Sequence, residues 1–242
     1  MQTLVTGAAT LSIALSPHQV AQFELYRREL LAWNERVNLT AITDPEEVLV
    51  KHFLDSLTVE LALGPEMAGA KTIDVGSGAG FPGIPLKIAH PELSLTLLEA
   101  TSKKAAFLKH VLESLMLLDV EVVTMRAEEA ARLPEHREAY ALVLARAVAP
   151  MAVLAEITLP LCKIGGIVVA PKKGPIADEI AQAEGPVSAL GGRFWDILDV
   201  EAPGLDDGRH LVVLEKIMPT PQRYPRRPGM PQKQPLKQTA HG

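Results

Sequence analysis

The chain has very little of what would cross-link it or carry it into a membrane. Its 242 residues include one cysteine, Cys162, which excludes an internal disulfide framework and a cluster of thiolate metal ligands. No apolar run approaches the ~20 residues of a membrane-spanning helix. The N-terminal stretch MQTLVTGAATLSIALS has no Lys or Arg ahead of its apolar residues, unlike a secretory signal. These absences predict a cytoplasmic protein that holds no metal and enters no membrane.

Acidic residues are missing from the C-terminal end. Six Lys or Arg and no Asp or Glu lie between Lys216 and Gly242, although the whole chain carries a net charge of −5. The segment contains YPRRPGMPQKQPLKQ, which is rich in proline and has too little apolar content to fold alone. It is either a solvated, disordered tail or an arm that grips phosphates.

Two helix starts are visible in the first 65 residues. Ser16-Pro17-His18-Gln19 has the pattern of a capping box, and an apolar stripe at spacings of three and four follows it. Asp44-Pro45 opens a second helix, expected to run to about Leu63, on which His52 shares one face with Asp55 and Ser56. Residues 1–65 are therefore predicted to form a helical cap.

From Lys71 onward short apolar strands alternate with helices. The strands read KTIDVG, SLTLLEA, VEVVTM, YALVLARA and GGIVVAP, followed by RFWDILDVEAP and RHLVVLEKI joined by a DDG turn. Such alternation is typical of a mostly parallel sheet with helices on both faces. Residues 66–217 are thus predicted to form a Rossmann-like α/β domain that ends in an antiparallel strand, and residues 218–242 a basic tail.

The strongest motif is IDVGSGAGFPG. Asp74 ends a strand, and Gly76, Gly78 and Gly80 follow at every second position, which lets a ligand approach the backbone closely. The third glycine comes one residue too early for a dinucleotide fingerprint, since Phe81 stands where that glycine is expected. The motif resembles instead the first motif of class I S-adenosylmethionine-dependent methyltransferases, although a tight turn without a ligand would also use these glycines.

The next two strands end in polar residues that suit an adenosine. Glu99 ends the second strand, where its carboxylate can accept hydrogen bonds from ribose hydroxyls. Arg126-Ala127-Glu128-Glu129 follows the third strand, where an adenine edge lies in this fold. Taken alone, that segment is equally the start of a solvated helix.

Arg146 follows the fourth strand, where methyltransferases of exocyclic amines usually place Asp or Asn before two prolines. A ring nitrogen with a free lone pair needs no base, so an arginine that positions the substrate and stabilises charge would suffice. The alternative is a structural salt bridge between Arg146 and a neighbouring carboxylate such as Asp74.

Six segments in this order closely resemble the RsmG family, also called glucose-inhibited division protein B. They are WNERVNLTAI, VLVKHFLDSL, DVGSGAGFPGIPLKI, LLEATSKKAAFLKHV, RAEE and ARAVAP, and the resemblance covers roughly residues 20–217. It implies a class I methyltransferase fold with an N-terminal helical cap. It also implies a monomeric bacterial enzyme that uses S-adenosylmethionine to methylate N7 of a guanine in the 530 loop of 16S rRNA, as free RNA or in a small ribosomal subunit particle.

The motifs, the basic residues and the resemblance together indicate which residues form the site. The candidate catalytic residues are Arg146, Asn38 and His52. The candidate cofactor-binding residues are Asp74, Gly76, Gly78, Gly80, Phe81, Glu99, Ala127, Glu128 and Arg146. The candidate RNA-binding residues are Lys103, Lys104, Arg126, Lys172, Lys173, Arg223, Arg226 and Arg227. On this interpretation the tail supplies RNA affinity and leaves cofactor affinity unchanged.

Other functions stay open on the sequence alone. A methyltransferase of a small molecule or protein would share the glycine motif, but it would not need the basic tail or Lys103, Lys104, Lys172 and Lys173. A nicotinamide dehydrogenase is disfavoured by the early third glycine. A binding protein without catalysis would show the same motifs.

Overall fold

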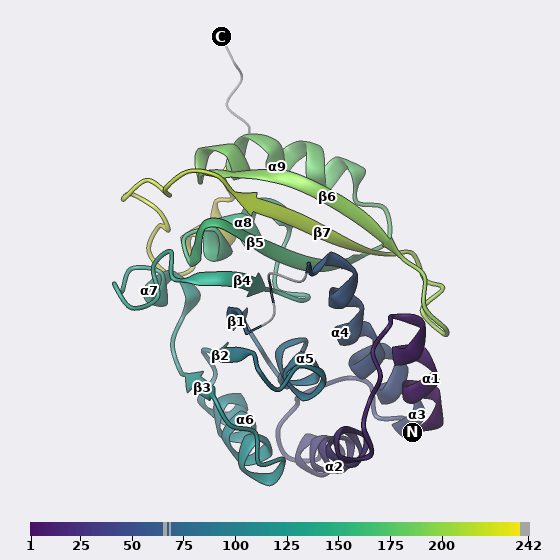
Figure 1. Cartoon of the computed structure of the whole chain (residues 1–242). Coiled ribbons are helices and arrows are strands. Elements are labelled where there is room, and N and C mark those ends of the chain that lie inside the picture. Colours follow the sequence, from purple (N-terminus) through teal and green to yellow (C-terminus); the bar gives the residue numbers. More distant parts are fainter. Residues whose placement is uncertain (65–66, 68, 238–242) are drawn as a thin grey trace.

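The strands form one seven-stranded sheet in the computed structural model, which describes residues 1–64, 67 and 69–237 (Figure 1). Its order is β3-β2-β1-β4-β5-β7-β6; the first five of these are parallel, and β7 is antiparallel to both of its neighbours. The strands are β1 (Lys71–Val75), β2 (Ser94–Leu98), β3 (Val120–Val123), β4 (Tyr140–Leu144), β5 (Cys162–Lys173), β6 (Gly192–Val200) and β7 (Arg209–Lys216). The predicted sheet is confirmed. Its strand order reverses between β1 and β4, where open α/β sheets bind ligands.

Helices cover both faces of the sheet. The helices between β1 and β6 are α5 (Gly83–Ala89), α6 (Ser102–Ser114), α7 (Ala127–Ala130), α8 (Met151–Thr158) and α9 (Ala177–Ala189). Ile84 of α5 and Leu108 of α6 share one apolar cluster with Phe23 of the N-terminal helices. Leu154 of α8 and Val187 of α9 belong to a second cluster. The N-terminal helices therefore extend the core on one face of the sheet instead of forming a core of their own.

The N-terminal cap begins with a helix that the sequence did not predict, α1 (Gln2–Thr10). It packs closely on the rest of the cap, because a Cβ at Gly7 would lie 2.5 Å from Leu54 Cδ2. The next helix, α2 (Pro17–Asn34), starts with the predicted capping box: Gln19 N donates to Ser16 Oγ, and Ser16 N donates to Gln19 Oε1. Its side chains Phe23, Tyr26 and Leu30 are fully buried.

The single helix expected after Asp44 is divided into four segments. They are α3 (Pro45–Val48), a π-helical turn (Leu49–Leu54), α4 (Asp55–Leu57) and a 3-10 turn (Thr58–Ala62). Asp44 caps the start, since its Oδ1 accepts from the N–H groups of Glu46 and Glu47. Single π-helical turns inside helices are frequent at functional sites. This one carries His52 and leads directly into Asp55.

Residues 218–237, which we call the strap, are docked on the body, so the disordered tail, one of the two alternatives that the sequence left open, does not describe them. The strap contains the short helix α10 (Met230–Lys233), which packs against α8, and Gly229 before this helix donates to Glu128 of α7. It docks because the body offers it a partner for a buried charge: Glu156 of α8 is fully buried and accepts two hydrogen bonds from the Arg226 guanidinium. The remaining residues of the predicted tail, 238–242, lie outside the described part of the chain.

Candidate functional site

The glycine motif forms a tight loop between β1 and α5. Gly76, Gly78 and Gly80 have φ values of 71°, 59° and 95°, a left-handed conformation that favours glycine. A Cβ at Gly80 would also lie 2.5 Å from Ile84 Cδ1 and 2.7 Å from the Tyr26 hydroxyl oxygen. The Tyr26 hydroxyl donates to the carbonyl of Ala79, so α2 of the cap fixes this loop.

Asp74 lies under the loop and is fully buried. Its Oδ2 accepts from Gly83 N at 2.9 Å, whereas its Oδ1 has no hydrogen-bond partner in the described part of the chain. Burial raises the pKa of Asp74 to about 7, although the bond from Gly83 and the charge of Arg146 oppose that rise. The carboxyl group is therefore a structural support of the loop and is not paired directly with Arg146.

Glu99 follows β2 and connects the same loop to the next strand. Its Oε2 accepts from Gly78 N at 3.0 Å and its Oε1 from Thr101 N at 2.7 Å. A carboxylate has about four lone-pair sites, so two sites remain for other donors. Its predicted contact with ribose hydroxyls stays a prediction, and the structure adds a second role as a clamp on the glycine loop.

A cavity of about 320 Å³, which we call the strand-end cavity, opens at the carboxyl ends of β1 and β2 and beside the loop after β4. Three of the predicted cofactor residues lie on its wall: Gly76, Ala127 and Glu128. Arg126, predicted to bind RNA, lies on this wall too. The other lining residues are Val75, Leu98, Ala100, Met125, Val148, Ala149, Val153, Ile157, Gly229, Pro231 and Gln232. Its size and mostly apolar wall are those of a small-molecule site.

A second cavity, the basic pocket, has a volume of about 350 Å³. Five basic side chains and one carboxylate are among its lining residues, which are Lys51, His52, Asp55, Arg146, Ala147, Pro171, Lys172, Lys173 and Arg209. Four carboxylates, Glu47, Asp55, Glu179 and Asp207, pair with these five cations, so a small excess of positive charge remains, and such an excess in a cleft attracts a polyanion. The basic pocket is therefore suited to phosphates.

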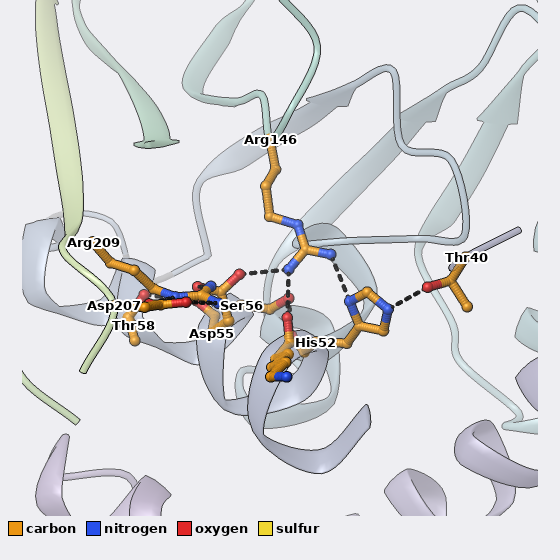
Figure 2. Close-up of polar contacts among 9 residues, drawn as sticks. Thr40, His52, Asp55, Ser56, Thr58, Arg146, Asp207 and Arg209 are labelled. Atoms are coloured by element: carbon orange, nitrogen blue, oxygen red, sulfur yellow. Dashed lines mark hydrogen bonds and ion pairs between the residues drawn. The ribbon is translucent and has the colours of Figure 1, made fainter. Parts of the chain in front are cut away.

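Arg146 is held by a network of polar contacts that crosses from the sheet to the cap (Figure 2). Its Nη1 donates to Asp55 Oδ2 at 2.6 Å, and its Nη2 donates to His52 Nδ1 at 3.0 Å. Asp55 Oδ1 accepts in turn from Arg209 Nη1, and Arg209 Nε donates to Asp207 Oδ1 at 2.7 Å. The salt bridge considered from the sequence thus exists, but its carboxylate is Asp55 and not Asp74.

His52 is locked in one neutral form. Its ring stacks on Phe81 at 4.5 Å between centroids, and burial together with the charge of Arg146 lowers the pKa of His52 to about 3. Because a guanidinium can only donate, Nδ1 must accept from Arg146, and Nε2 then carries the proton. Nε2 lies 2.7 Å from Thr40 Oγ1, so the hydroxyl oxygen of Thr40 accepts this proton in a hydrogen bond.

The loop after β4 separates the two cavities. Arg146 and Ala147 line the basic pocket, whereas Val148 and Ala149 line the strand-end cavity. Ala147 has φ 54°, a left-handed conformation that costs an alanine about 1 kcal/mol or more and is common at functional sites. This loop brings a small-molecule cavity and a phosphate-attracting pocket within two residues of each other.

Four other predicted residues, Asn38, Phe81, Lys103 and Lys104, line neither cavity. Asn38 is exposed and makes no side-chain hydrogen bond within the described ranges; Thr40 of the same NLT segment makes the contact to His52 instead. Phe81 does not line the strand-end cavity. Its ring lies beneath Arg146, whose Cζ is 5.0 Å from the Phe81 ring centroid. Lys103 and Lys104 stand in the first turn of α6, where a positive charge opposes the helix dipole.

The remaining basic residues differ in their partners. Lys172 donates to Glu179 at 2.6 Å, and Lys173 pairs with Asp207 at 2.6 Å while its side chain stays 63% exposed. Arg223 and Arg227 are exposed on the strap. Arg226 differs from both because it is engaged with Glu156. Their contacts with RNA stay predictions.

Some site residues were not selected from the sequence. The sequence could have indicated Asp55, because it shares a helix face with His52. No pattern in the sequence indicates Arg209, which is a single arginine after the DDG turn. It contacts Asp55 because the fold brings β7 close to the cap. Gly229, Pro231 and Gln232 belong to the predicted basic tail, for which the sequence indicated no part in the cofactor site, yet they line the strand-end cavity.

Residues 1–64, 67 and 69–237 contain neither a candidate metal site nor a candidate membrane-spanning helix. No group of His, Cys, Asp and Glu side chains there could hold a metal ion. No helix there is long and apolar enough to cross a membrane.

Comparison with known proteins identifies the family. The family model GidB, described as rRNA small subunit methyltransferase G, matches residues 19–204. Proteins named "Ribosomal RNA small subunit methyltransferase G" from Dehalococcoides mccartyi and Roseiflexus castenholzii are 53% and 50% identical over 236 residues, 98% of this chain and 100% of each relative.

Solved structures share the fold at low identity. The structure titled "MtNAS in complex with MTA and tNA" has a TM-score of 0.55 and 15% identity, and the match covers 81% of this chain and 71% of that one. TrmN from Thermus thermophilus has a TM-score of 0.51 and 18% identity, over 68% of this chain and 48% of that one. Sequence and fold agree: the chain belongs to the GidB family of rRNA small subunit methyltransferases G and has the class I methyltransferase fold.

Proposed function

We propose that the protein transfers the methyl group of S-adenosylmethionine to N7 of a guanine in the 530 loop of 16S rRNA, as a monomer in the cytoplasm. Family membership supports methylation of small-subunit rRNA. One structural observation carries the proposal: the strand-end cavity and the basic pocket meet at the loop that carries Arg146. A methyl donor in the first and an RNA nucleotide in the second would be neighbours across this loop.

The residues of the strand-end cavity fit S-adenosylmethionine. Left-handed glycines leave the backbone open beside the wall, and the Glu99 carboxylate keeps free lone pairs for hydroxyl donors next to Leu98 and Ala100 of that wall. An apolar wall suits an adenine ring. S-adenosylmethionine supplies an electrophilic methyl group on a sulfonium.

The reaction at N7 requires no proton transfer. The N7 lone pair would form the new bond to the methyl carbon as the carbon–sulfur bond breaks. The electron pair of the broken bond would stay on the sulfur. Guanine N7 carries no proton, so the neutral His52 is not needed as a base. The protein's task is then to orient the base and to control charge.

Positive charge moves onto the guanine ring during transfer, close to an arginine. Asp55 neutralises part of the charge of Arg146, and His52 stays uncharged because its pKa is about 3. Arg146 still has two N–H groups, on Nε and Nη2, with no acceptor in the described ranges. They can hold the guanine carbonyl, a phosphate or the cofactor carboxylate while N7 stays open.

Methyl transfer to defined RNA tests the proposal. Labelled S-adenosylmethionine should methylate 16S rRNA, free or in the small subunit particle, and should not methylate RNA carrying 7-deazaguanine at the target position, because that base lacks N7. Methylation of the deaza RNA would refute N7 as the acceptor. Methylation of protein or metabolites instead of rRNA would refute the substrate.

A pair of glycine variants provides the protein control. Gly78→Val places a side chain in the left-handed loop beside the strand-end cavity and should abolish cofactor binding in calorimetry. Gly165→Val imposes a similar backbone strain at φ 78° with no atom within 4 Å, so it should still bind. Equal affinity in both variants would show that the glycine loop is not part of the cofactor site.

A further inference from the structure

The strap contributes to the wall of the strand-end cavity. Gly229, Pro231 and Gln232 line that cavity together with Ala127 and Glu128 of α7. These strap residues follow the end of the family match at residue 204. The cavity is therefore completed by a segment that lies outside the matched core.

Two sets of contacts fix the strap to the body. Arg226 Nη2 lies 2.6 Å from Glu156 Oε2, its Nε lies 2.8 Å from Oε1, and its backbone N donates to Oε1 at 2.9 Å. Arg137 donates to the carbonyls of Thr220 at 2.8 Å and Tyr224 at 3.0 Å, and Arg132 donates to the carbonyl of Pro225. Removing one partner of a buried ion pair leaves an uncompensated charge, so the Arg226 contact resists opening.

A third contact joins the strap to the cavity wall itself. Glu128 is 8% exposed, and its Oε1 accepts from Gly229 N at 2.8 Å. The donor lies at a left-handed glycine with φ 79° that precedes α10. One side chain of α7 thus borders the cavity and holds the strap at the same time.

We propose that the strap is part of the S-adenosylmethionine site and that its docking sets the affinity for the adenine end of this ligand. The inference rests on the proposed use of S-adenosylmethionine. With the ribose at Glu99 after β2, as predicted, the base would lie toward α7 after β3, because the sheet order continues from β2 to β3. The strap borders this end. This proposal is the opposite of the expectation from the sequence that the tail leaves cofactor affinity unchanged, and the experiments below decide between the two.

Point variants in the strap separate its docking from its presence. Gly229→Pro removes the N–H group that donates to Glu128 and forbids the left-handed backbone. Gln222→Ala is the control, because Gln222 is an exposed strap residue that does not line the cavity. Uncovering about 55 Å² of apolar ligand surface corresponds to about a tenfold loss of affinity. We expect about that loss in Gly229→Pro and a change under about threefold in Gln222→Ala.

Three ligands locate the effect in calorimetry: S-adenosylmethionine, S-adenosylhomocysteine and 5′-methylthioadenosine, which lacks the amino-acid end. A wall at the adenine end predicts a similar loss for all three in Gly229→Pro. Loss confined to the two ligands with an amino-acid end would overturn the assignment to the adenine end.

A shortened chain provides the second test. A chain ending at Pro221 and carrying Glu156→Met, so that no buried carboxylate is left unpaired, should bind all three ligands at least about tenfold more weakly. A chain ending at Lys237 keeps the strap and should bind like the parent. Parent-like affinity in the folded Pro221 chain and in Gly229→Pro would overturn the inference while the proposed function stands. A parent that binds no S-adenosylmethionine would overturn both.

Discussion

Replacing Asp55 with asparagine should destabilise the protein and slow methyl transfer, because one carboxylate neutralises two arginines. The Asp55 side chain is 7% exposed, and those of Arg146 and Arg209 are 15% and 14% exposed. Breaking a fully buried pair costs about 3 to 5 kcal/mol, and residual hydration of the guanidinium groups places this case at about 2 to 3 kcal/mol. The measurement is urea unfolding, in which the midpoint should fall with little change in slope.

The same substitution should lower the single-turnover rate of rRNA methylation by about 10-fold to 100-fold, because Arg146 loses the partner that orients it. Asp199→Asn is the matched control: this carboxylate pairs with His210 at 2.7 Å but is 79% exposed, so its loss should change stability by about 0.5 kcal/mol or less. If Asp55→Asn and Asp199→Asn had the same small effect on unfolding and rate, the network in Figure 2 would not hold Arg146. A double-mutant cycle with Arg209→Met measures the coupling directly.

Three further predictions concern the site. Arg146→Lys keeps the charge but loses the planar fork, so single-turnover methylation should fall by about 100-fold to 1000-fold, nearly as far as in Arg146→Ala; a rate within threefold of the parent would make it a structural residue only. Because burial raises the pKa of Asp74 to about 7, the folded protein binds more protons than the unfolded chain between pH 4 and 7, and stability falls as pH rises through this range. Asp74→Asn should remove that slope in unfolding experiments on the ligand-free protein, and an unchanged slope would contradict the raised pKa. Replacing Lys103 and Lys104 with alanine should reduce the salt dependence of RNA binding by about 1.4 log units per tenfold change in salt if both contact single-stranded phosphates, and should leave cofactor affinity unchanged.

The parts of the site that were predictable depend on neighbours in sequence. Asp74, the three glycines and Glu99 could be placed because Asp74 lies near the end of an apolar strand and the others follow such a strand closely. Parallel strands bring their carboxyl ends to one edge of the sheet. The start of α2 was predictable for the same reason, since a capping box spans four residues.

The contacts that were not predictable join distant parts of the chain. The partner of Arg146 is Asp55, 91 positions earlier, and nothing in the spacing prefers it over Asp74. The docking of the strap could not be predicted because its own apolar content is too small to indicate a folded segment. Its docking depends on Glu156, 70 positions before Arg226, whose burial is a property of the fold.

The single cysteine has a practical consequence for following the strap by spectroscopy. Cys162 begins β5 and is fully buried, and burial raises the pKa of its thiol to about 12. At pH 7.5 the reactive thiolate is then a negligible fraction, whereas an exposed cysteine with a pKa near 8.5 is about one-tenth thiolate. A maleimide dye should therefore leave the native protein unlabelled and react with a cysteine introduced at the exposed Arg227, which gives a fluorescence reporter on the strap without removal of any native residue near the core.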